Sequence, residues 1–65
     1  MIHVRLEPEA KDIELHRIKT VLGLLNRLEL RPTMALVVRD GCLLTPDRRL
    51  YNNDHVLVRT VTSAG

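Results

Sequence analysis

The sequence predicts one small α+β domain in which a mixed sheet of four to five strands packs on a single helix. Three observations support this class: alternating apolar and polar residues near the start, one segment with apolar residues at helical spacing, and an Asp-Gly pair between two apolar runs. The chain has 65 residues, of which 45% are hydrophobic. A domain of this size buries only roughly 60% of the surface that its unfolded chain exposes. We therefore expect one domain over residues 1–61 and a flexible C-terminal tail over 62–65.

The first segment, residues 2–7, alternates apolar and polar side chains and predicts a strand with Ile2, Val4 and Leu6 on its buried face. Alternation returns over 12–16, so a turn around 8–11 would make a hairpin of the two strands. Good helix formers after Pro8 offer an alternative, a long helix from residue 9 onward. Its apolar stripe would meet polar residues at positions 14 and 17, which favours the hairpin.

The next segment predicts the helix, because its apolar residues follow spacings of three and four: Ile18, Val21, Leu22, Leu25 and Leu28. Thr20 is the expected N-cap, accepting a hydrogen bond from the amide of residue 22 or 23. Gly23 costs roughly 1 kcal/mol against alanine inside a helix, so we expect it to permit close packing on the sheet. Pro32 closes the segment.

The second half of the chain predicts three more strands. Residues 34–38 form a continuous apolar run, which is typical of a central strand, and the Asp40-Gly41 turn joins it to the run Cys42-Leu43-Leu44 in a hairpin. Polar and proline-containing stretches at 45–47 and 52–54 predict turns within a loop. Residues 55–61 are rich in strand-forming residues and predict the last strand.

Several classes of chemistry are not expected. Cys42 is the single cysteine, so the chain forms no internal disulfide, and we interpret it as a small apolar residue that opens a strand. The three histidines, His3, His16 and His55, lie too far apart in the sequence to match a metal-ligand spacing. We assign them to ordinary strand surface and expect no metal or cofactor bound by this chain.

The charge indicates no nucleic-acid binding. The formal net charge is +2 and the basic residues are spread along the chain, with Arg48-Arg49 the only contiguous pair. Tyr51, the single aromatic residue, forms no stacking platform by itself. No apolar run approaches the about 20 residues that would cross a bilayer, and the start lacks a signal-peptide pattern. We expect a soluble, cytoplasmic protein without a membrane role.

The order strand, strand, helix, strand, hairpin, strand is the β-grasp arrangement, and the chain resembles the ubiquitin-like sulfur carriers of the ThiS/MoaD family over its whole length. The matching positions are Thr20-Val21 with Leu24-Leu25 in the helix, the Asp40-Gly41 turn, and Asn53-Asp54-His55-Val56 before the last strand. A small-residue tail, Thr62-Ser63-Ala64-Gly65, follows that strand. The family ends in Gly-Gly, and this sequence departs from it at Ala64.

The resemblance implies that the chain is not an enzyme but a protein substrate. A ubiquitin-activating-like enzyme would adenylylate the carboxylate of Gly65 with ATP and magnesium, and the product would become a sulfur-donating thiocarboxylate. Thr62, Ser63 and Ala64 would thread through a narrow channel of that partner. The acceptor would be an enzyme such as the large subunit of molybdopterin synthase or thiazole synthase. The alternative is a ubiquitin-like protein modifier or a β-grasp interaction module with an inert Ala-Gly tail.

Overall fold

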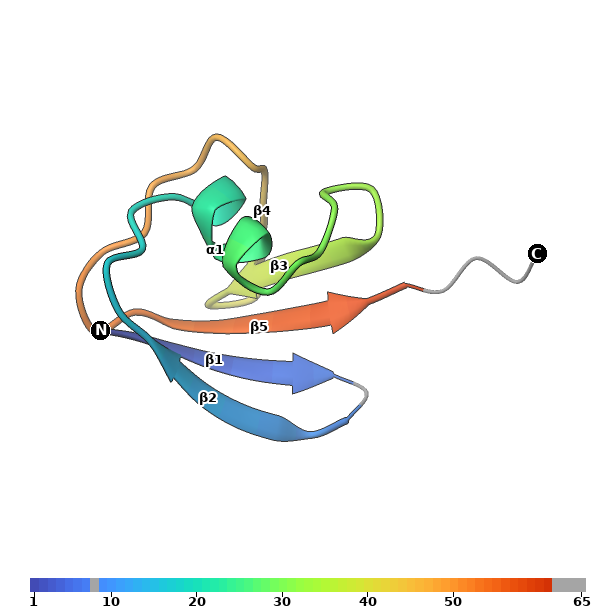
Figure 1. Ribbon diagram of the computed structural model, residues 1–65, viewed down its shortest axis with the longest axis horizontal. Helices are drawn as coiled ribbons and strands as arrows, with labels where there is room; N and C mark the ends of the chain where they lie inside the picture. The colour runs from blue at the N-terminus through green and yellow to red at the C-terminus, as the bar shows by residue number, and fades with distance from the viewer. Residues whose placement is uncertain (8, 62–65) are drawn as a thin grey trace.

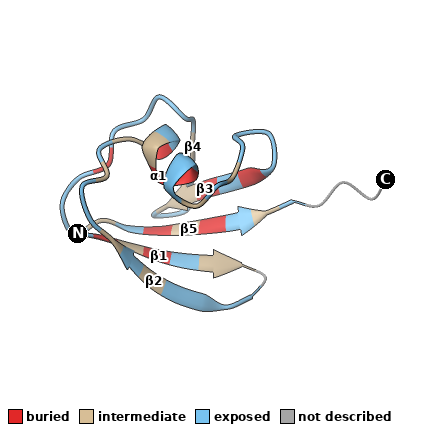
Figure 2. Cartoon of the chain, viewed as in Figure 1, coloured by how far each residue is buried: buried red, intermediate tan, exposed pale blue. Residues whose placement is uncertain are grey.

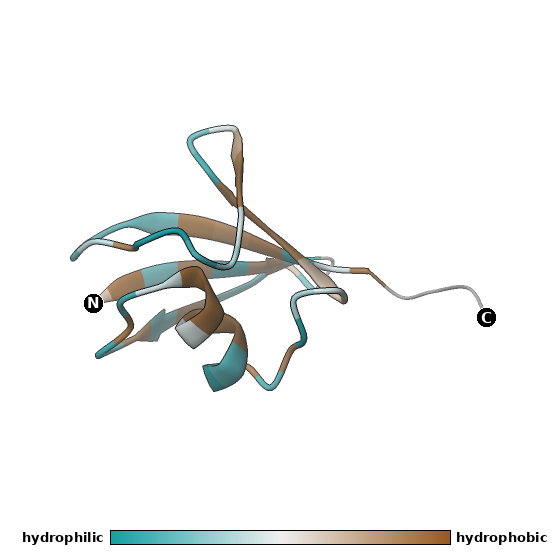
Figure 3. Ribbon diagram, turned by 90° about the horizontal axis from the view of Figure 1, so that it is seen from above, coloured by the Kyte–Doolittle hydropathy of each residue, from teal (hydrophilic) through white to brown (hydrophobic). Residues whose placement is uncertain are grey.

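The computed structural model describes residues 1–7 and 9–61, which form a five-strand mixed sheet with one helix on one side of it (Figures 1 and 3). The elements in chain order are β1 (Ile2–Glu7), β2 (Lys11–Leu15), α1 (Val21–Arg27), β3 (Ala35–Arg39), β4 (Cys42–Leu44) and β5 (His55–Thr60). Across the sheet the order is β2-β1-β5-β3-β4. Strands β1 and β5 are parallel, and the other neighbours are antiparallel. The described residues thus confirm the predicted α+β class.

The first two strands form the predicted antiparallel hairpin, with Val4 opposite Ile13. Ile2 and Val4 are each 2% exposed and Leu6 packs against the core, as their alternation predicted. The alternative helix after Pro8 does not form, since β2 occupies that segment. The hydrophobic period therefore outweighed the helical propensity of the residues that follow the proline.

The helix begins where the sequence predicted. Thr20 has extended backbone angles, and its hydroxyl accepts a hydrogen bond from the amide of Gly23 at 3.1 Å. The helix ends at Arg27, earlier than Pro32 predicted, because a hydrogen-bonded C-terminal cap ends it first. The amide of Leu30 donates to the carbonyl of Leu25 and the amide of Glu29 to that of Asn26. With Glu29 at φ 59°, this is a Schellman motif without its usual glycine.

Two expectations for the helix are wrong. Leu22 was predicted to be in the core but is 44% exposed, whereas Leu24 is fully buried. A helix of seven residues buries one face, and here that face contains positions 21, 24 and 25, so Leu22 turns away from the sheet. Gly23 does not allow close packing on the sheet, since the nearest atom to an added Cβ is the hydroxyl oxygen of Thr20, at 3.4 Å.

The Asp40-Gly41 turn joins β3 to β4 as predicted. Both residues have positive φ, 53° and 78°, which is the conformation of a type I′ hairpin turn. Strand β3 is an interior strand, between β5 and β4, and this confirms the prediction from its apolar run.

The core lies between α1 and the face of the sheet that the helix covers (Figure 2). Its buried members are all apolar: Ile2, Val4, Val21, Leu24, Leu25, Ala35, Val37, Leu50, Val56 and Val58. Within the described ranges, no polar or charged residue is buried. Any functional polar group of the described residues is therefore at the surface. No helix in the described part of the chain is long and apolar enough to cross a membrane.

Candidate functional site

The last strand leads directly into the predicted tail. Strand β5 lies between β1 and β3, and it is hydrogen-bonded to both. Beyond its end, the amide of Val61 still donates to the carbonyl of Met34 at 2.9 Å. The predicted attachment residue Gly65 and the predicted threading residues Thr62, Ser63 and Ala64 lie outside the described residues. The structure therefore fixes the point from which the tail departs.

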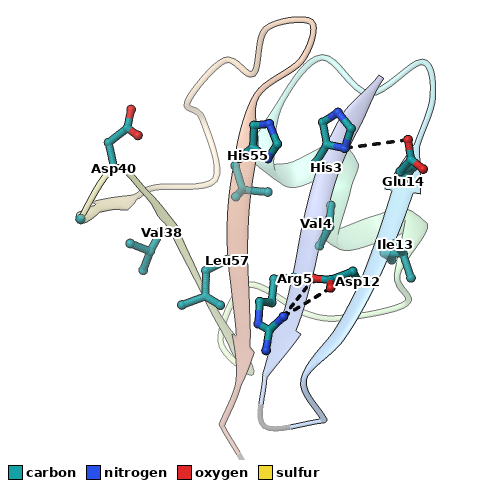
Figure 4. A pocket seen from close by; sticks show the side chains of 12 residues that line it. His3, Val4, Arg5, Asp12, Ile13, Glu14, Val38, Asp40, His55 and Leu57 are labelled. Carbon is teal, nitrogen blue, oxygen red and sulfur yellow. Dashed lines mark hydrogen bonds and ion pairs between the residues drawn. The ribbon is translucent and has the colours of Figure 1, made fainter.

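The face of the sheet opposite α1 is open and carries a shallow hollow (Figure 4). Charged side chains from β1 and β2 line one half of it. Arg5 contacts Glu7 through Nε at 3.3 Å and Asp12 through Nη1 at 3.2 Å. The hydrogen bond to Glu7 is the largest cause, and with the charge and hydrogen bond of Asp12 it raises the pKa of the Arg5 guanidinium above its ordinary value. Because the guanidinium keeps its proton in any case, these contacts orient side chains and supply no acid or base.

His3 and His55 come together on this face, which the sequence spacing did not predict. Their positions are in register on the parallel strands β1 and β5, and the rings stack with centroids 4.4 Å apart and planes 8° apart. On the other side of His3, Glu14 approaches its Nδ1 at 3.8 Å. The strand pairing creates this row, so no local motif could have revealed it. His16 lies elsewhere, exposed after the end of β2.

This row does not form a metal site in the described residues, where no three His, Cys, Asp or Glu side chains are placed to hold an ion. Stacked rings hold their nitrogen lone pairs in two nearly parallel planes, so the two imidazoles do not converge on one point. The predicted interpretation of His3 and His55 as strand-surface residues agrees with their positions on β1 and β5.

The other half of the open face is mainly apolar, with the exposed Arg59 of β5 opposite Leu36. Val38 on β3 lies opposite Leu57 on β5 and opposite Leu43 on β4, and Leu36 follows two residues earlier on the same side of β3. Leu43 is 62% exposed and Leu36 is 44% exposed. Strand register therefore joins these residues into a continuous apolar row, which the sequence alone could not assign to a face.

Cys42 opens β4 as predicted, opposite Arg39, and its thiol is exposed.

A comparison with models of protein families finds no match, and a comparison with curated proteins finds none either.

Proposed function

We propose that this chain is a β-grasp sulfur carrier, whose terminal glycine is activated by a partner enzyme and converted to a thiocarboxylate. The observation that carries the proposal is the position of β5. It is the middle strand of the sheet, paired with β1 as far as Arg59 and with β3 as far as Thr60, and the amide of Val61, directly before Thr62, still donates to the carbonyl of Met34. A rigid domain that precedes a short run of small residues suits a carrier that presents one carboxylate to other proteins.

The topology supports the β-grasp part of the proposal. Two antiparallel strands at one end of the chain, a helix across the sheet, a second hairpin and a final central strand parallel to the first reproduce the order expected from the sequence resemblance. The helix cap at Thr20 and the turn at Asp40-Gly41, two of the positions on which the resemblance rests, occupy structural roles that explain their residue types.

The chemistry would take place at Gly65 in the partner's active site. A carboxylate is a poor electrophile, so one of its oxygens attacks the α-phosphorus of magnesium-bound ATP and pyrophosphate leaves. Attack of a sulfide-level donor, hydrosulfide, on the acyl carbon of the adenylate then releases AMP and, after loss of a proton, leaves a thiocarboxylate. The described residues of this chain supply no buried polar group for these steps. Its own contribution is docking and the position of the tail.

The test is the intact mass of the protein recovered from its native host under thiol-preserving conditions, with fragmentation at the C-terminus. The proposal expects Gly65 to carry one oxygen replaced by sulfur. It also expects that deletion of Gly65 abolishes the modification, while a Ser63→Ala variant, as a matched tail control, retains it. An unmodified carboxylate after incubation with the host's adenylating enzyme, ATP and a sulfur donor would overturn the proposal.

A second candidate is a β-grasp interaction module with an inert tail. The observation that favours it is the apolar row of Leu36, Val38, Leu43 and Leu57 on the open face, whose most exposed member is 62% exposed. Exposed apolar residues that gather on one face suit a protein interface. The module would keep its partner binding when Gly65 is deleted, whereas the carrier would lose its activity.

A further inference from the structure

Three exposed cations from two segments that are distant in the sequence lie at one corner of the domain: Lys19, Arg48 and Arg49. An isolated antiparallel bridge pairs Thr20 with Arg49. Beside it, the amide of Leu50 donates to the carbonyl of Lys19 at 2.8 Å. Figure 1 shows the two segments running side by side before β5 begins. The sequence suggested scattered charge, and the fold collects part of it.

Tyr51 adds an aromatic ring to this corner. Leu50 is 3% exposed and therefore points into the core, while Tyr51 is 59% exposed. In an extended segment the two neighbours of an inward-pointing residue point outward on the same side. Arg49 and Tyr51 therefore face solvent together. We call Lys19, Arg48, Arg49 and Tyr51 the basic corner.

Hydrogen bonds from the Arg39–Asp54 pair fix the backbone of the basic corner at Arg49 and Tyr51. The Nη1 of Arg39 donates to Oδ2 of Asp54 at 2.8 Å and to the carbonyl of Arg49 at 3.2 Å. The same Asp54 oxygen accepts the backbone amide of Tyr51 at 2.8 Å. The side chains of this pair are only 25% and 21% exposed. Because the backbone is fixed in advance, little further ordering is needed when a partner binds.

The cations of the basic corner have no ionic partner in the described residues. Carboxylates lie within ion-pair distance of His3, Arg5 and Arg39 only. The adjacent Asp47 accepts a hydrogen bond from the hydroxyl of Thr45, and the charge of Arg48 is a lesser cause of its lowered pKa. Exposed arginines without an ion pair, beside an exposed tyrosine, have the composition of protein-interface hot spots, and the positive charge selects a negatively charged partner.

We propose that the basic corner docks an acidic segment of a partner protein, with carboxylates against Lys19, Arg48 and Arg49 and an apolar side chain against Tyr51. A protein fits better than a nucleic acid, because single-stranded nucleic acids need a basic track with several stacking rings, and here there is one ring and a focal charge. The corner lies where β5 begins, whereas the tail departs from its end. Binding here therefore does not depend on Gly65.

The test uses a fluorescein-labelled acidic heptapeptide of Glu and Asp with one central phenylalanine, titrated by fluorescence anisotropy at low ionic strength. An Arg48→Gln/Arg49→Gln variant should bind about tenfold more weakly, from two charge contacts of roughly 0.7 kcal/mol each. The matched control, Arg27→Gln/Arg31→Gln, removes the same charge elsewhere and should change affinity by less than about twofold. Equal losses in both variants, or no binding to the parent protein, would refute the proposal.

Two further measurements identify the kind of partner. Tyr51→Ala should weaken the phenylalanine-containing peptide about threefold to tenfold and leave an all-acidic heptapeptide unchanged. An oligouridylate of the same charge should bind more weakly than the peptide. If it binds more tightly and loses affinity in the Arg48→Gln/Arg49→Gln variant, the corner is a nucleic-acid site and the proposal is wrong. Deletion of Gly65 should not alter peptide affinity, so this result is independent of the sulfur-carrier test.

Discussion

Replacing Glu29 with glycine should stabilise the domain, because Glu29 holds a backbone conformation that is strained for any residue with a Cβ. Its φ is 59°, and it is the residue that closes the Schellman motif after α1. The two amides that follow the helix, those of Glu29 and Leu30, are already bonded to helix carbonyls at 3.0 and 2.8 Å. Glycine would keep these bonds and remove the strain.

The magnitude follows from two opposing terms. The left-handed conformation costs a residue with a Cβ about 1–2 kcal/mol. Glycine loses more backbone freedom on folding, which costs about 0.5–1 kcal/mol. The net gain should be roughly 0.5–1 kcal/mol, and for a domain of this size it raises Tm by roughly 2–8 °C.

The assay is urea unfolding followed by circular dichroism, with the gain visible as a higher midpoint at an unchanged slope. Glu29→Ala is the matched control, because it removes the same charge near the helix C-terminus but keeps the Cβ. If the glycine variant is no more stable than the alanine variant, left-handed strain at position 29 does not limit stability and the reasoning fails.

Other predictions test the core, the helix, a titrating group and the tail. Leu24→Ala should cost roughly 2–5 kcal/mol in urea unfolding, since Leu24 is fully buried, and a loss below 1 kcal/mol would contradict its core position. Gly23→Ala should add about 0.5–1 kcal/mol, because an added Cβ meets only ordinary contact; destabilisation would show that the site is tighter. The hydrogen bond from Thr45 is the main cause that lowers the pKa of Asp47, so Thr45→Ala should raise that pKa in an NMR titration. Because the pKa of Asp47 is lowered in the folded state, its carboxylate stabilises the fold above the ordinary carboxyl pKa, and this stabilisation is lost as pH falls through the lowered pKa. An unchanged Asp47 titration in the Thr45→Ala variant would show that the Thr45 hydrogen bond is not the cause. Ala64→Gly should strengthen binding to an adenylating partner by about fivefold to 150-fold if one methyl costs about 1–3 kcal/mol in a narrow channel, and equal affinities would indicate a wider one.

Local patterns were enough to predict most elements of the fold. The alternation of Ile2, Val4 and Leu6 identified both β1 and its buried face, and the Asp40-Gly41 pair identified a hairpin turn. The helix start at Thr20 was also predictable, because an N-cap is a local hydrogen bond. The assignment of Leu22 to the core failed, since spacing allowed two neighbouring faces and packing against the sheet chose one.

The surface sites were less predictable, because they join residues from distant segments. The stacked pair of His3 and His55 depends on the parallel register of β1 with β5. The basic corner depends on a bridge between Thr20 and Arg49. A single sequence does not show which distant segments pair, so it gives no signal for either contact.

The sequence by itself determined the class of the fold, the order of its elements and the small-residue run after the last strand, because these follow from local periodicity, caps and turns. Only the tertiary structure decided which strands pair beyond the two hairpins, which face of the sheet remains open and which charges gather at a corner. The physical reason is that a strand's neighbours are selected by shared burial and long-range hydrogen bonds, which no short stretch of sequence contains.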